Sequence, residues 1–376
     1  MKKALIAAAV AGAFAAPSVM AAELSTNVYW STGISMGETT STTAAAAGGV
    51  DSTINNDEVA DGGGNRLMFT WTDTLDNGIG VNAYLSFGNL NTAGAGGVNV
   101  RNANIGFSGD FGKVQVGTNE HFSETDLLFD PSYGDFGRTG DAISFIQLGQ
   151  TTFNFTRRDT ESVWYTSNDM NGLQFRAVYI MGPNTASVAG ADQDGTQIGV
   201  TYTSGPLTVG ASQASYNDYA NNGGTAAADA SVAGTESTMT SFRATYDMGM
   251  VMVKAAVWDL EQSGLVATNA VIDGANAAST GFEVSGQSIF IGMPINGGTL
   301  WAQSSSLGDQ DATLAAGTSA INASGKTGFD IGYHHAMNSQ VNFFLRYGES
   351  ETEVNFGVAD ASSETETLLL GWQLMY

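Results

Sequence analysis

The sequence predicts an all-β fold in which sixteen antiparallel strands close into a transmembrane β-barrel. Three observations support this prediction. Strand-like runs of about ten residues follow one another from residue 24 onward, and a tilted strand needs ~9–11 residues to cross a bilayer. The connections between the runs are either short or long, and the two kinds alternate along the chain. The chain also begins with the pattern of an export signal.

The export signal consists of two lysines, an apolar segment from Leu5 to Ala16 and a small-residue cleavage site ending at Ala21. We therefore expect residues 1–21 to be a signal peptide and residues 22–376 to form one barrel domain. The apolar segment is too short to span a bilayer, and no later run approaches the ~18 apolar residues of a membrane helix. Strands, not helices, are thus the expected membrane-crossing elements.

The strand-like runs alternate between apolar and polar residues, which is the period of a β-strand with two different faces. The last run is the clearest, because every second residue of its end is apolar or aromatic. Its apolar face is predicted to carry Leu368, Leu370, Trp372, Leu374 and Tyr376. In a membrane barrel such a face points to lipid, and closure leaves no strand edge unpaired.

The strand count follows from the connections. Seven connections are short and rich in turn residues: 75–78, 109–112, 168–172, 204–206, 247–249, 294–298 and 336–339. Eight are long and polar: 37–64, 89–98, 119–158, 182–195, 217–237, 260–282, 308–325 and 350–364. Fifteen connections join sixteen strands, an even number, and they predict turns at one end of the barrel and loops at the other.

Composition excludes several classes of function. The chain has 13 basic and 37 acidic residues and a formal net charge of -24, whereas nucleic-acid binding needs clustered positive charge. It has no cysteine, which excludes a disulfide framework, a cysteine metal site and a cysteine nucleophile. We therefore expect no nucleic-acid partner.

The connection at 119–158 is the longest segment that is neither a clean strand nor a low-complexity loop. Ser123 is a suitable N-cap for a short helix, and Asp126 stands at the matching third position. Pro131 ends that helix, and scattered glycines then impose an irregular path that carries several charged residues.

Three segments resemble the general diffusion porins of Gram-negative outer membranes: residues 65–78, 101–117 and 162–175. The resemblance covers essentially the whole mature chain. It implies a homotrimer of sixteen-stranded barrels in the outer membrane of a Gram-negative bacterium. It also implies that the third loop, about residues 119–158, folds into the lumen and narrows a water-filled pore.

The resemblance also suggests which residues line the constriction. On the basic wall, Arg66, Arg101 and Arg158 stand where the family has arginines, with Arg157 a substitute for Arg158. Strand alternation independently places Arg66 on the polar face, but it leaves Arg101 ambiguous because apolar residues share its parity.

On the acidic loop, Asp135 in a Gly-Asp-Phe-Gly sequence matches the family's carboxylate. The family's second acid would fall on Pro131, so Asp130 is its nearest replacement. Facing charges would order the water in the gap and favour polar solutes over apolar ones.

We therefore expect passive diffusion of small hydrophilic solutes and ions, with a mild cation preference from the acidic loops. Outer-membrane lipid and lipopolysaccharide are the expected surroundings, with divalent cations bridging the acidic surface to lipopolysaccharide. Two other barrel functions stay open: a substrate-specific channel and a structural or adhesive surface barrel.

Enzymatic activity is not expected, and neither is a cofactor or a metal site. The Gly33 to Gly37 segment has the letters of a nucleophile elbow but lies in a strand with no following helix. The chain has three histidines, and His334 and His335 would point to opposite faces of one strand. His121 with Glu120 and Glu124 forms the remaining candidate, for which a solvated loop histidine is the simpler interpretation.

Overall fold

The computed structural model describes residues 23–42, 51–61, 65–88, 90, 98–122, 158–181, 194–217, 236–263, 271–272, 275–276, 279–308, 311–314, 325–355 and 360–376. Sixteen of the strands in these ranges form the wall: β1 (Glu23–Thr42), β4 (Arg66–Thr74), β5 (Gly80–Gly88), β6 (Asn99–Gly109), β7 (Gly112–Glu120), β8 (Arg158–Thr166), β9 (Leu173–Ile180), β10 (Asp194–Ser204), β11 (Leu207–Asn217), β12 (Glu236–Asp247), β13 (Met252–Ser263), β16 (Ser279–Ile295), β17 (Gly298–Leu307), β19 (Lys326–Ala336), β20 (Val341–Asn355) and β21 (Asp360–Met375). Short strands add to the loop side: β2 (Asp51–Asn55), β3 (Glu58–Asp61), β14 (Val271–Ile272), β15 (Ala275–Asn276) and β18 (Asp311–Leu314).

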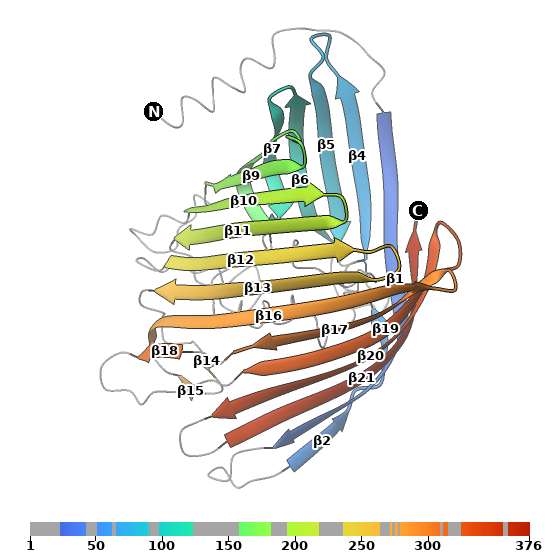
Figure 1. The fold of residues 1–376 in the computed structure, drawn as a ribbon, viewed down its shortest axis with the longest axis vertical. Coiled ribbons are helices and arrows are strands. Elements are labelled where there is room, and N and C mark those ends of the chain that lie inside the picture. Colours follow the sequence, from blue (N-terminus) through green and yellow to red (C-terminus); the bar gives the residue numbers. More distant parts are fainter. Residues whose placement is uncertain are drawn as a thin grey trace.

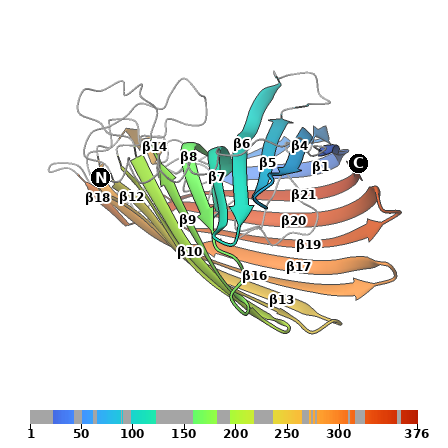
Figure 2. The same cartoon turned by 90° about the horizontal axis from the view of Figure 1, so that it is seen from above.

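The wall is a closed antiparallel barrel. Each of the sixteen strands pairs with its neighbours in chain order, and β1 pairs with β21 from Tyr29 opposite Met375 to Thr42 opposite Ser362. Two further hydrogen bonds link Val28 and Tyr376, at 2.6 and 2.9 Å. β1 thus lies between β4 and β21 (Figure 2), and the successive strands of the wall follow each other in Figure 1. The predicted closed sixteen-stranded barrel is confirmed.

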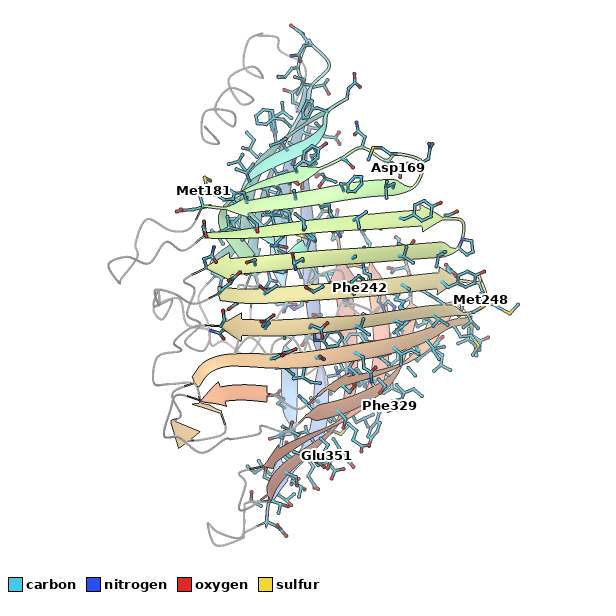
Figure 3. All side chains as sticks on the ribbon, turned by 60° about the vertical axis from the view of Figure 1, so that its left-hand side comes forward. Asp169, Met181, Phe242, Met248, Phe329 and Glu351 are labelled. Atoms are coloured by element: carbon cyan, nitrogen blue, oxygen red, sulfur yellow. The ribbon has the colours of Figure 1, made fainter. Side chains whose placement is uncertain are left out.

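The outer face of the wall is apolar, as the alternation predicts. On β21, Leu368, Trp372 and Leu374 are exposed, whereas Leu369 and Gln373 between them are buried. Phe242 and Phe329 on other strands are 54% and 42% exposed (Figure 3). A closed barrel that exposes large apolar side chains all round fits a lipid environment. Within the described residues, no helix has the length and apolar character to cross a membrane.

Short turns gather at one end of the barrel. The described short connections are 75–79, 110–111, 167–172, 205–206, 248–251, 296–297 and 337–340, and they agree with the seven that the sequence predicts. Gly78 shows why glycine is needed, because its φ is 81° and its N–H donates to the Leu75 carbonyl at 2.8 Å. Asp169 and Met248 mark this end in Figure 3, and Met181, which precedes a long connection, marks the other.

Two long connections contain more strand than the sequence predicts. β20 ends at Asn355 and β21 begins at Asp360, so most of the connection predicted at 350–364 is paired strand. Within the connection predicted at 37–64, β2 and β3 pair with β1. These extensions are mostly polar, as in Glu351 opposite Glu364, and hold only scattered apolar residues such as Ile54 and Val59. They therefore lack the apolar alternation by which the strands were recognised.

Two tryptophans of the wall point inward and not toward lipid. Trp258 and Trp301 are 1% and 3% exposed. Each lies over a glycine of the next strand: Trp258 is opposite Gly286 and Trp301 is opposite Gly332. The flat rings fill the space that the missing side chains leave, so these tryptophans line the inner wall.

Candidate functional site

Arg66 opens β4 on the inner face of the wall, as its parity predicts. It stands opposite Tyr29 of β1, and its guanidinium carbon lies 5.4 Å from the centroid of the Tyr29 ring. Tyr29 in turn accepts a hydrogen bond from Gln373 at 2.7 Å. This aromatic contact directs the arginine along the inner wall, and the Arg66 side chain keeps 21% of its surface exposed.

Arg101 is brought to the inner face by a β-bulge. In the β5–β6 ladder Ser86 pairs with Asn102 and Phe87 pairs with Val100, so Arg101 is the extra residue. Its side chain is 5% exposed and packs over Gly88, where an added Cβ would lie 2.2 Å from the Arg101 Cδ. The bulge resolves the ambiguous parity of Arg101, because strict alternation does not hold at this point.

Glu120, the last residue of β7, joins the two arginines. Its Oε1 lies 3.3 Å from the Arg101 Nη2 and 3.7 Å from the Arg66 Nη1. Sequence reasoning missed this role. Asn104 of β6 accepts a hydrogen bond from Gln115 and donates one to Asn119, so these alternate residues of β7 share the inner face. Strict alternation would therefore place the side chain of Glu120 on the outer face.

The other predicted constriction residues are only partly described. Arg158 begins β8, and its backbone stands directly opposite Glu120 in the β7–β8 ladder. The side chain of Arg158 lies outside the described part of the chain, and so do Arg157, Asp130, Asp135 and the short helix expected after Ser123. The structure thus brings Arg66 and Arg101 together through Glu120 and pairs the Arg158 backbone with the backbone of Glu120.

The long connection after β7 begins against the inner wall. Phe122 is 3% exposed and lies 4.3 Å from the Arg176 guanidinium and 6.0 Å from the Trp164 ring, measured at the ring centroids. It also covers Gly199, where a Cβ would come within 2.6 Å of its ring. Arg176, Trp164 and Gly199 face inward on β9, β8 and β10, so the chain turns toward the lumen at this point.

His121 shares this location. Its ring stacks on Tyr216 with 5.7 Å between centroids, and it is 1% exposed. Burial lowers the pKa of His121 from its usual 6.5 to about 3, so the imidazole is neutral at physiological pH. This is a packed aromatic position and not the solvated loop histidine that the sequence suggests.

Within the described part of the chain, no three histidine, cysteine, aspartate or glutamate side chains are grouped so that they could hold a metal ion. His334 and His335 occupy opposite faces of β19. His335 stacks on Tyr333 of the outer face, with 6.0 Å between ring centroids.

A closed barrel with a lipid-compatible outer face and charged residues on its inner wall defines an outer-membrane channel. The chain belongs to the Gram-negative porin family, whose profile matches residues 4–355. A sequence search among curated proteins finds no match.

Several solved outer-membrane proteins share the fold. An anion-selective porin from Comamonas acidovorans is 13% identical, with 94% of this chain and 100% of that chain covered and a TM-score of 0.66. OmpT of Vibrio cholerae in a trimer form is 15% identical, with 93% and 100% covered and a TM-score of 0.60. Salmonella typhi OmpF is 15% identical, with 94% and 97% covered and a TM-score of 0.57.

Family and fold together make this chain an outer-membrane porin, a channel for passive diffusion.

Proposed function

We propose that the channel is narrowed by facing charges, with Arg66, Arg101 and Arg158 on the wall and Asp135, assisted by Asp130, on a third loop that folds into the lumen. The observation that carries this proposal is the start of that loop. His121 and Phe122 are buried against inward-facing residues of β8 to β11, and an inward start of the connection supports a loop that folds into the lumen. The wall arginines lie beside the same strand end.

Such an arrangement passes small hydrophilic solutes and ions. Charges facing each other across a narrow gap produce a transverse field that low-dielectric walls do not screen well. Water in the gap is ordered by this field, so an apolar solute loses hydrogen bonds that a polar solute replaces. The whole chain has 37 acidic against 13 basic residues, and the acidic excess in the loops favours cations mildly at the pore mouth.

The barrel assembles as a homotrimer. An apolar hollow of about 300 Å³ on the outer wall of β1, β4, β5 and β6 offers a surface for a neighbouring barrel. It is lined by Leu24, Phe69, Trp71, Ala83, Leu85 and Ala103, among others. The trimer form of Vibrio cholerae OmpT is a precedent for such an assembly in this fold.

The sequence pattern adds two elements to this proposal. Residues 1–21 act as a signal peptide that directs export, and they lie outside the described residues. Acidic side chains on the loop side of the outer face, such as Glu261, Glu351 and Glu364, lie where lipopolysaccharide surrounds the barrel.

Charge reversal tests the constriction. Zero-current potentials in a salt gradient across planar bilayers give the cation-to-anion permeability ratio of the wild type, Arg66→Glu and Asp135→Lys. We expect Arg66→Glu to raise this ratio and Asp135→Lys to lower it, each by roughly threefold or more, since a unit charge near the ion path changes local ion concentrations on that scale. Glu261→Lys, on the outer face, is the control. Unchanged ratios in both constriction variants would remove the proposed site.

A further inference from the structure

Glu120 is a carboxylate among the wall arginines. Its Oε1 contacts Arg101 at 3.3 Å and Arg66 at 3.7 Å, and 28% of its side chain is exposed. We propose that Glu120 sets the ion selectivity of the channel by neutralising part of the basic wall. This inference rests on the constriction proposed above.

The local structure holds the three charges in place. The bulge in β6 makes Arg101 an inward residue, and Gly88 leaves the space in which its side chain lies. Arg66 is held over the Tyr29 ring. Glu120 closes the group from the end of β7, immediately before the buried pair His121 and Phe122. Its carboxylate is thus fixed by strand geometry, not by a long loop.

The charge balance of this group decides its effect on ions. Arg66, Arg101 and Glu120 together carry one net positive charge, and Glu120→Gln raises that to two without changing the size of the side chain. Even at the dielectric constant of water, a unit charge ~7 Å from an ion changes its local concentration roughly threefold. The low-dielectric wall strengthens this effect.

The test compares variants in planar bilayers by their cation-to-anion permeability ratio. Glu120→Gln should lower the ratio by roughly threefold or more, and Arg101→Gln should raise it by a similar factor. The double variant Glu120→Gln with Arg101→Gln has the wild-type net charge and should return to within about twofold of the wild-type ratio. Glu261→Gln, which removes an exposed carboxylate from the outer face of β13, is the matched control.

The outcomes separate this inference from the function on which it rests. If Glu120→Gln conducts with the wild-type ratio, or if Arg101→Gln shifts the ratio in the same direction as Glu120→Gln, the role of Glu120 is overturned. The channel and its constriction would stand in that case. Should Glu120→Gln fail to fold, Arg101→Gln and the double variant still decide, since their predicted ratios differ. Unchanged ratios in both Arg66→Glu and Asp135→Lys would instead remove the constriction itself.

Discussion

The guanidinium Nε of Arg346 lies 3.0 Å from Oδ1 of Asp330, and both side chains are almost fully buried on the inner wall, at 5% and 2% exposure. The two residues lie diagonally across the β19–β20 ladder, where Arg346 is opposite Gly332 and Asp330 is opposite Gly348. The register of this ladder thus brings the two opposite charges together on the inner face.

Breaking this pair should destabilise the barrel. Arg346→Met leaves Asp330 charged and buried, a change that costs about 3–5 kcal/mol in other proteins. Replacing both residues, Arg346→Met with Asp330→Leu, should recover most of the loss. Urea unfolding in detergent, followed by tryptophan fluorescence, measures both variants. A single variant as stable as the double variant would show that the pair has no such role.

Gly332 is predicted to be intolerant of any side chain. A Cβ at this position would lie 2.5 Å from Cζ2 of Trp301, so Gly332→Ala should cost about 1–3 kcal/mol through overpacking. Gly308→Ala is the matched control, because its nearest neighbour is at 3.4 Å. Combining Gly332→Ala with Trp301→Leu should relieve the strain. Equal stability of the two alanine variants would contradict the packing described for Trp301.

The outer face is predicted to contact lipid. Phe242 is 54% exposed there, and an arginine near the bilayer midplane costs about 2–4 kcal/mol in such barrels, so Phe242→Arg should weaken folding into vesicles by that order. Thr70→Arg, on the inner face of β4, is the control and should change little. A comparable loss of folding free energy in both variants would contradict the assignment of lipid contact to the outer face.

His121 should make stability depend on pH. Its folded pKa of about 3 lies below the unfolded value of 6.5, so the unfolded chain binds the proton first. The contribution of His121 to stability is therefore complete above pH 6.5 and is lost as pH falls toward 3. The loss is at most about 1.4 kcal/mol per pH unit.

His121→Phe keeps a ring for Tyr216 and removes the titration. Unfolding at several pH values between 7 and 4 should show a shallower loss of stability for this variant than for the wild type. Parallel curves for the two proteins would contradict the buried, neutral state of His121.

The fold could be predicted from sequence because its determinants are local. Period-two alternation on β21 and turn residues such as those at Leu75 to Gly78 define strands, faces and turns without knowledge of distant contacts. The inward position of Arg66 follows from the same rule.

The features that could not be predicted from the sequence depend on the register of neighbouring strands. The bulge that turns Arg101 inward is a mismatch between β5 and β6, and the contact of Glu120 with both arginines arises across β4, β6 and β7. Trp258 and Trp301 line the inner wall because glycines stand opposite them on neighbouring strands. No single segment contains the information for such pairings.

Conductance of the purified protein in planar bilayers tests the central claim most directly. A passive, water-filled channel should give discrete opening steps with current that is linear in voltage and rises in proportion to salt concentration. For the proposed trimer, the conductance steps should occur in groups of three. A folded protein that inserts and never conducts, or one whose current saturates with a single solute, would contradict an open diffusion pore.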